Sequence, residues 1–333
     1  MNAKGPNKAF GQMQNASQDL GSSNNVSLFR EFLIVGGELG LKDFYTELAV
    51  LLLVVYLFVL IGNIMIFSVV MLDSRLHTPM YIFLSNLSFI DIVITTTVLP
   101  KMISVCLLND IAISFSGCFL QLYVYLAFQS SESCLLGAMA YDRYVAICNP
   151  LRYNNIVTTR TCALLAISAL ALGLLFPLPS VIPASKLPFC NNQIFFWFCD
   201  FPPVVTLSCL DPAFFMFLAL GSATLALCGP FAIVIWSYCK IIRSISRITS
   251  LDGRKKAFST CSSHLIVVFL FYFAHMCVYI SATAKHVPPN VLTLISILNC
   301  FLTPLVNPII YSFRNKELKV ALQKLVHVNK GFP

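Results

Sequence analysis

Seven long apolar stretches, separated by short polar segments, dominate the sequence. They cover residues 48–71, 80–100, 115–141, 161–183, 212–239, 257–284 and 287–313. A helix needs about 20 apolar residues to cross the hydrocarbon core of a bilayer, and each stretch reaches that length. Alternating strands of about ten residues, as in an outer-membrane barrel, do not occur. Because backbone in lipid must satisfy its own hydrogen bonds, the pattern predicts an all-α bundle of seven transmembrane helices.

Composition supports a protein that is folded in a membrane. Of the 333 residues, 58% are hydrophobic and 11% are charged, whereas soluble domains have about 25% charged residues. Within the seven stretches, the only Asp, Glu, Lys or Arg residues are Asp91 and Glu132. These properties exclude a soluble enzyme, a disordered tail protein and a small disulfide-stapled domain, although the chain has 13 cysteines.

The distribution of basic residues predicts the orientation in the membrane. Fifteen of the 22 Lys and Arg residues lie after the first, third and fifth stretches or in the carboxyl-terminal tail. Such an excess is typical of the cytoplasmic side. We therefore expect an extracellular amino tail (1–47), a transmembrane domain (48–313) and a cytoplasmic tail (314–333) in a multi-pass plasma-membrane protein. The positive charge then faces anionic membrane lipid, and no nucleic-acid partner is expected.

Further features belong to the two sides of the membrane. Asn15 and Asn25 begin Asn-x-Ser sequons in the outer tail and are candidate glycosylation sites, with unused polar tail as the alternative. Four cysteines fall on the oxidising outer side: Cys118, Cys190, Cys199 and Cys209. They can form two disulfides, and the sequence alone leaves three pairings open. On the inner side, apolar residues at helical spacing predict a short amphipathic eighth helix on the membrane: Leu318, Leu322, Leu325 and Val326.

A set of motifs occurs in a fixed order along the chain. Residues 139–153 read MAYDRYVAICNPLRY, and the others are Gly62-Asn63, LHTPMYIFLSNLSFID at 76–91, Ser237-Tyr238, KAFSTCSSHL at 256–265 and PLVNPIIYSFRN at 304–315. Together they closely resemble the signatures of odorant receptors, in the rhodopsin-like superfamily of G-protein-coupled receptors. The resemblance implies that the protein binds a small odorant and activates a stimulatory, olfactory-type heterotrimeric G protein, which raises cAMP. It also implies that Cys118 pairs with Cys199, and Cys190 with Cys209.

The resemblance assigns a group of residues to G-protein coupling and the activation switch: Asp142, Arg143, Tyr144, Tyr238, His264, Asn307, Pro308 and Tyr311. Asp142 is expected to hold Arg143 at rest, and activation frees Arg143 to meet the carboxyl-terminal helix of the G-protein α subunit. Composition alone would favour an interfacial arginine that reaches the lipid headgroups beside a neighbouring acid, and the length of the motif favours the switch role instead. Pro304 and Pro308 interrupt the hydrogen bonds of the seventh stretch and permit a kink there.

Two acids inside the bundle are candidates for an ion or proton network. A carboxyl group in lipid is unfavourable, so Asp91 and Glu132 should face the bundle interior, with Asn63 as a polar neighbour. In the related receptors, the position that matches Asp91 belongs to a sodium and water network. The alternative is a protonated pair that only packs helices together. Apart from a sodium ion near Asp91, no cofactor and no metal are expected.

The expected ligand site lies between helices in the outer half of the bundle. Helical steps from Cys118 place Tyr125, Leu126, Gln129 and Ser130 there, facing Tyr272, His275, Met276 and Tyr279 of the sixth stretch. By resemblance these positions border the odorant pocket, and ordinary helix packing is the alternative for each. No carboxylate is expected in this outer half. Amines are therefore disfavoured, whereas His275 and Lys285 are expected to donate hydrogen bonds to a carboxylate or a polar neutral molecule.

Other classes of membrane protein fit less well. The chain has no Gly-rich phosphate loop and no metal-ligand spacing of Cys and His, so no enzyme is expected. A rhodopsin-like chemoreceptor that acts outside the nose is one alternative. A transporter or channel is another, although the sequence has no internal repeat and no paired broken helices.

Overall fold

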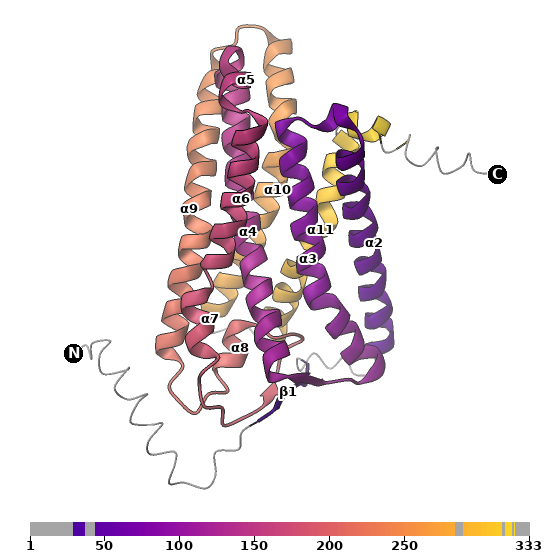
Figure 1. Cartoon of the computed structure of the whole chain (residues 1–333), viewed down its shortest axis with the longest axis vertical. Coiled ribbons are helices and arrows are strands. Elements are labelled where there is room, and N and C mark those ends of the chain that lie inside the picture. Colours follow the sequence, from indigo (N-terminus) through magenta and orange to yellow (C-terminus); the bar gives the residue numbers. More distant parts are fainter. Residues whose placement is uncertain (1–28, 37–43, 284–288, 315–316, 322, 324–333) are drawn as a thin grey trace, which may run out of the picture.

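The predicted apolar stretches are helical and pack side by side in one bundle (Figure 1). The computed structural model describes residues 29–36, 44–283, 289–314, 317–321 and 323. The long segments are α2 (Tyr45–Leu72), α3 (Pro79–Leu108), α4 (Phe115–Cys148), α6 (Thr159–Leu175) followed by α7 (Leu178–Ala184), α9 (Ala213–Ser246), α10 (Leu251–Thr283) and α11 (Pro289–Arg314). The short helices are η2 (Ser74–Leu76), η3 (Pro150–Arg152), α5 (Tyr153–Ile156) and α8 (Phe201–Val205). Each predicted stretch corresponds to one long segment, which confirms the all-α fold class.

Several helix ends follow from local sequence. Ser114 caps α4, because its hydroxyl accepts a hydrogen bond from the amide of Gly117 at 3.1 Å. Asn109 ends α3 in the left-handed conformation, with φ of 52°. Pro177 and Pro179 lack amide hydrogens and cannot continue the helical hydrogen bonds, so the helix is interrupted between α6 and α7. The fourth predicted stretch is therefore two consecutive helices.

Helix α4 lies at the centre of the bundle, in contact with α3, α6, α7, α9 and α10 (Figure 1). In the described part of the chain, six helical segments are long and apolar enough to cross a membrane, and α4 is not among them. Its polar residues Gln129, Ser131, Glu132 and Ser133 are buried. Neighbouring helices rather than lipid surround α4, so it tolerates these residues. The sequence analysis treated all seven stretches alike and missed this difference.

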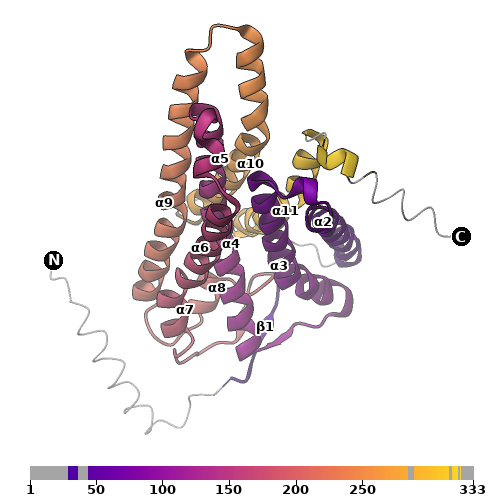
Figure 2. The same ribbon diagram turned by 45° about the horizontal axis from the view of Figure 1, so that its top comes forward.

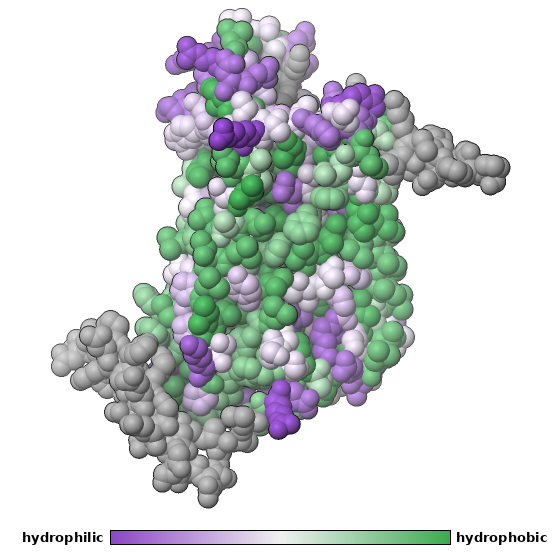
Figure 3. All heavy atoms as spheres, viewed as in Figure 1, coloured by the Kyte–Doolittle hydropathy of each residue, from purple (hydrophilic) through white to green (hydrophobic). Residues whose placement is uncertain are grey.

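On the face shown in Figure 3, a band of apolar side chains lies between two more polar ends. On α2, for example, Leu57, Phe58 and Ile61 are exposed, as expected for residues that face lipid. Helices α9 and α10 continue beyond the other helices at one end (Figures 1 and 2). That end carries basic residues such as Arg243 and Arg254, which agrees with the predicted cytoplasmic side.

A three-stranded sheet lies at the opposite end, in the order β2-β1-β3. Strand β1 (Glu31–Ile34) pairs antiparallel with β2 (Ala112–Ser114) and parallel with β3 (Gln193–Ile194). Phe32 and Ile34 of β1 are fully buried, and the Phe32 ring stacks on Phe115. The sequence analysis did not predict this strand, because four residues are too short for a clear alternating pattern.

The inner tail is described in part. Residues 317–321 are helical and Leu318 is buried, in line with the predicted amphipathic helix. The hydroxyl of Tyr81 donates a hydrogen bond to Glu317 at 2.9 Å, which connects this helix to α3. Several residues named in the sequence analysis lie outside the described residues: Asn15, Asn25, Lys285, Leu322, Leu325 and Val326.

The contact between α6 and the central helix depends on Gly173. A Cβ atom at this position would overlap Ser131 Oγ and would lie 2.6 Å from the carbonyl oxygen of Ala127. Both atoms belong to α4: the first is a side-chain hydroxyl oxygen and the second a backbone carbonyl oxygen. The two helices therefore approach each other closely enough that only hydrogen fits between them.

We expect Gly173→Ala to reduce the free energy of unfolding by about 1–3 kcal/mol, because overpacking forces α6 away from α4. The measurement is the thermal unfolding midpoint of the purified protein in detergent. Gly221→Ala on α9 is the control, since a Cβ there would meet nothing within 4 Å. Equal midpoints for the two variants would contradict the proposed close contact.

Candidate functional site

A cavity of about 440 Å³ opens between helices near the β-sheet end of the bundle. Ligand sites typically have about 300–1,000 Å³. Residues of α4, α7, α8, α9, α10 and α11 line it. The apolar part of the wall includes Leu126, Phe176, Phe201, Met216, Leu220 and Leu227. The polar part consists of Tyr125, Gln129, Ser130, Ser180, Asp200, Ser222, His275 and Asn299.

The structure brings most of the predicted ligand residues to this cavity. Five of them line it: Tyr125, Leu126, Gln129, Ser130 and His275. Tyr272 is not among its lining residues. The Tyr272 hydroxyl lies 3.0 Å from Ser133 Oγ, and its ring packs against Phe231 with a centroid distance of 4.5 Å. Tyr272 thus connects α10 with α4 and α9 instead of forming the cavity wall.

The remaining sixth-stretch predictions have different outcomes. Met276 does not line the cavity, and 53% of its surface is exposed. It lies one residue after His275, about 100° around the helix, and this rotation turns it outward. The side chain of Tyr279 and the whole of Lys285 lie outside the part of the chain that the structure describes.

The structure adds a carboxylate to the cavity wall that the sequence analysis did not expect there. Asp200 lies directly before α8, and its Oδ1 accepts a hydrogen bond from the amide of Phe201 at 2.8 Å. Burial raises the pKa of Asp200 to about 6, while the hydrogen bond from Phe201 acts in the opposite direction. The prediction of an outer half without a carboxylate is therefore wrong. The sequence signal was an acid next to a disulfide cysteine and before a Phe-Pro-Pro helix start.

Two disulfides fix the loop that carries Asp200. Cys118 at the start of α4 pairs with Cys199, and Cys190 pairs with Cys209, the same pairings that the resemblance implies. The amide of Cys199 also donates a hydrogen bond to Oε1 of Gln121 on α4, at 2.9 Å. Cys199 is fully buried. The loop is thus held over the cavity by one covalent bond and one hydrogen bond to the central helix.

A polar network lies deeper between α2, α3, α4 and α11. Nδ2 of Asn307 donates to Asp91 at 2.9 Å, and Nδ2 of Asn63 donates to the carbonyl oxygen of Pro304 at 3.0 Å. Glu132 is fully buried and lies within electrostatic range of Asp91. Oδ1 of Asp91 has no hydrogen-bond partner among the described residues. Both oxygens of Glu132 likewise have no hydrogen-bond partner among the described residues, so this buried region holds two incompletely paired carboxyl groups.

The α2–α11 contact beside this network requires Gly62. A Cβ at Gly62 would lie 2.9 Å from Cβ of Pro308. Pro308 therefore packs directly against the backbone of α2, next to Asn63. This contact gives the Gly62-Asn63 motif a structural role, because it packs the proline-containing part of α11 against α2.

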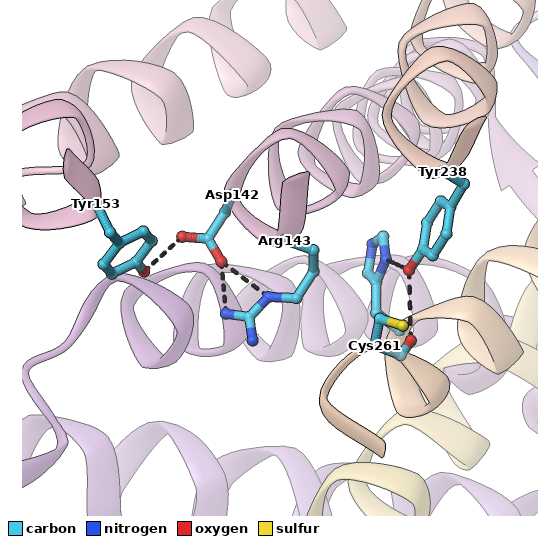
Figure 4. Close-up of polar contacts among 6 residues, drawn as sticks. Asp142, Arg143, Tyr153, Tyr238 and Cys261 are labelled. Atoms are coloured by element: carbon cyan, nitrogen blue, oxygen red, sulfur yellow. Dashed lines mark hydrogen bonds and ion pairs between the residues drawn. The ribbon is translucent and has the colours of Figure 1, made fainter. Parts of the chain in front are cut away.

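At the inner end of α4, Asp142 holds Arg143 (Figure 4). Nε of Arg143 donates to Oδ2 of Asp142 at 2.9 Å, and the hydroxyl of Tyr153 donates to Oδ1 at 2.8 Å. Asp142 and Arg143 are both buried. Tyr153, the last residue of the inner motif, was not singled out from the sequence. Both carboxylate oxygens are thus occupied, and Arg143 is turned toward its own neighbour.

Other predicted switch residues gather near Arg143. The hydroxyl of Tyr238 lies 2.8 Å from Nδ1 of His264 and donates to the carbonyl oxygen of Cys261 at 3.3 Å (Figure 4). Tyr311 is buried, and its hydroxyl has no hydrogen-bond partner among the described residues. Tyr238, His264 and Tyr311 are all within electrostatic range of Arg143.

Tyr144 is separate from this cluster. Its ring packs against Trp236 of α9, with a centroid distance of 4.8 Å. Tyr144 therefore contributes to the α4–α9 contact in this structure and does not join the other tyrosines.

Comparisons with known proteins agree with these features. A family model described as olfactory receptor matches residues 52–329. The chain is 42% identical to human olfactory receptor 6K3 over 309 residues, which cover 92% of each chain. It is 43% identical to human olfactory receptor 10C1 over 306 residues, covering 91% of this chain and 97% of the relative. It is 41% identical to the olfactory receptor-like protein OLF3 of Canis lupus familiaris, covering 91% of this chain and 96% of that protein.

We expect Cys199→Ser to reduce the free energy of unfolding by about 2–5 kcal/mol, because the disulfide closes a long loop between residues 81 positions apart. The thermal unfolding midpoint measures this loss. Cys239→Ser is the control, since Cys239 is a free and exposed cysteine. An unchanged midpoint for Cys199→Ser would show that the bridge does not hold the loop.

Proposed function

Because the chain belongs to the olfactory receptor family, we propose that it binds a small odorant in the outer cavity and activates a stimulatory, olfactory-type G protein that raises cAMP. The protein is a multi-pass receptor of the plasma membrane and not an enzyme. The observation that carries the proposal is that the same helices line the cavity at one end and carry the switch residues at the other.

The cavity supports the binding of a small, largely apolar molecule. Its volume suits such a ligand, and its wall combines aliphatic and aromatic side chains with a few polar groups. The disulfide between Cys118 and Cys199 holds a loop over it. A ligand that enters this space loses its contact with water, so its apolar surface contributes directly to the binding free energy.

Three helices connect the cavity to the inner end. Helix α10 carries His275 in the cavity wall and His264 three turns further along, about 16 Å away at 1.5 Å per residue. Helix α4 carries Gln129 and Arg143, and α11 carries Asn299 and Tyr311. A helix is stiff along its axis, so a ligand that displaces one of these helices also displaces its inner end.

The contact between Tyr272 and Ser133 is the first that such a displacement would change. It joins α10 to α4 between the cavity and the inner end. The contact between Tyr238 and His264 joins α9 to α10 further in. We propose that movement of α10 breaks both contacts and that Arg143 then leaves Asp142. The freed guanidinium meets the carboxyl-terminal helix of the G-protein α subunit.

The buried network of Asp91, Glu132 and Asn63 is proposed to hold a sodium ion or a proton in the resting receptor. The unpaired Oδ1 of Asp91 supports this role. A buried carboxylate without a donor is unfavourable, and a bound cation or proton removes that penalty. Asn307 connects the network to α11, so that repacking of α11 and loss of the cation are coupled.

The test is a cAMP assay in cells that express the full chain, with a panel of volatile alcohols, acids and amines. We expect at least one compound to raise cAMP in a dose-dependent way, and only when the G protein is present. Ligand-driven ion current or solute flux without the G protein would instead support a channel or transporter.

We expect Arg143→Ala to abolish G-protein activation by an active compound while binding persists, because Arg143 lies far from the cavity. G-protein nucleotide exchange measures activation, and the ligand-induced rise in unfolding temperature measures binding. Arg152→Ala is the control, because Arg152 is exposed at the same end of the bundle. Normal activation by Arg143→Ala at equal surface level would refute the assigned role.

A further inference from the structure

Several polar groups in the cavity wall offer oxygen lone pairs to a ligand. Ser130, Ser180 and Ser222 each donate their hydroxyl hydrogen to a backbone carbonyl of their own helix turn, at 2.8 Å, 2.9 Å and 3.0 Å. Only their oxygen lone pairs then remain for a ligand. Among the described residues, Oε1 of Gln129 and Oδ1 of Asn299 are buried and have no donor. A ligand that donates hydrogen bonds therefore finds several acceptors here, beside the donors of Tyr125 and of the Gln129 and Asn299 amides.

His275 belongs to the same group. Its Nδ1 lies 2.9 Å from the carbonyl oxygen of Phe271. A carbonyl oxygen only accepts, so Nδ1 carries the hydrogen, and in the neutral ring Nε2 is an acceptor. The sequence analysis expected His275 to donate to a carboxylate ligand. The observed hydrogen bond commits the Nδ1 hydrogen to the backbone.

Asp200 adds a negative charge to these acceptors. In the described structure the carboxylate of Asp200 accepts one hydrogen bond, from the amide of Phe201, and no described Lys, Arg or His forms an ion pair with it. Its pKa of about 6 leaves it ionised at neutral pH. A carboxylate that is removed from water without a cation is unfavourable. A cationic ligand would supply the missing charge.

On the basis of the odorant-receptor function proposed above, we propose that Asp200 is the counter-ion for a small apolar amine and that this receptor therefore prefers amines to matched acids. The ammonium group donates to Asp200 and to the acceptors Gln129 and Asn299. The hydrocarbon part packs on Leu126, Met216 and Leu220. An acid in the same place would face the like charge of Asp200, which disfavours it.

The position of Asp200 suits a recognition role. The disulfide of the preceding residue, Cys199, and the hydrogen bond from the Cys199 amide to Gln121 fix the backbone on one side. Helix α8 begins directly on the other side. A charge on such a rigid segment does not need to be ordered when the ligand binds, so less conformational entropy is lost.

The test uses three probes of equal chain length: n-hexylamine, n-hexanol and n-hexanoate. Each is titrated at neutral pH against the purified full-length receptor, and the rise in unfolding temperature gives its apparent affinity. In the wild type we expect hexylamine to bind most tightly and hexanoate most weakly. This ranking is measured without any variant and so does not depend on a variant that folds.

Asp200→Asn removes the charge while the Asn side chain can still cap α8. We expect it to weaken hexylamine binding about tenfold or more, with hexanol affected much less. Asp211→Asn is the matched control. Asp211 lies in the same loop and accepts a hydrogen bond from the amide of Ala213 at the start of α9, but it does not line the cavity.

The outcomes separate this inference from the function on which it rests. Tightest binding of hexanoate, no binding of hexylamine, or equal hexylamine binding by wild type and Asp200→Asn would overturn the counter-ion role. Activation of the G protein by alcohols or acids in those cases would leave the receptor function intact. Conversely, Asp200-dependent binding of hexylamine without any G-protein activation would support the counter-ion and contradict the receptor function.

Discussion

The burial of a polar helix inside an apolar bundle is the constraint on which this structure depends. Residues such as Gln129, Ser131 and Glu132 would be unfavourable in lipid, so α4 must be surrounded by other helices. That enclosure requires close approach, and Gly173 provides it on the α6 side. The more apolar helices can then face lipid with side chains such as Phe58. Enclosure of α4 by the other helices thus explains both the polar residues at the centre and the apolar residues on the lipid-facing surface.

The same helix connects the functional parts. Its outer end is linked by Cys118 to the loop that carries Asp200, and its middle forms one wall of the cavity. Further along, Glu132 lies near Asp91, and the inner end holds Arg143 against Asp142. Because one helix passes through all four regions, α4 is the element along which the proposed activation would couple the cavity to the inner end. The Tyr272–Ser133 contact lies on this path.

The sequence was most informative where hydrophobic length or a specific motif determines the outcome. The seven segments followed from hydropathy, and the pairings of Cys118 and Cys190 from the family resemblance. Side-chain direction was harder to predict, because helix rotation decides whether Met276 or His275 faces inward, and one residue changes the direction by about 100°. Loop geometry was hardest. Asp200 reaches the cavity because a disulfide and a short helix fix its backbone, and hydrophobic periodicity carries no information about that contact.

Incompletely paired carboxylates occur at two depths of this receptor, and their environments give them different roles. Asp91 accepts a hydrogen bond from Asn307 and lies near a second acid, Glu132, deep between helices. The partner proposed for it is therefore a small cation or a proton. Asp200 lines a cavity of about 440 Å³, so a larger cation can reach it. Each unpaired charge reduces the stability of the empty resting state. Under the proposed functions, a ligand at Asp200 and an ion or proton at Asp91 would stabilise different packings of α4 and α11, and competition between these packings would provide the free energy for a switch.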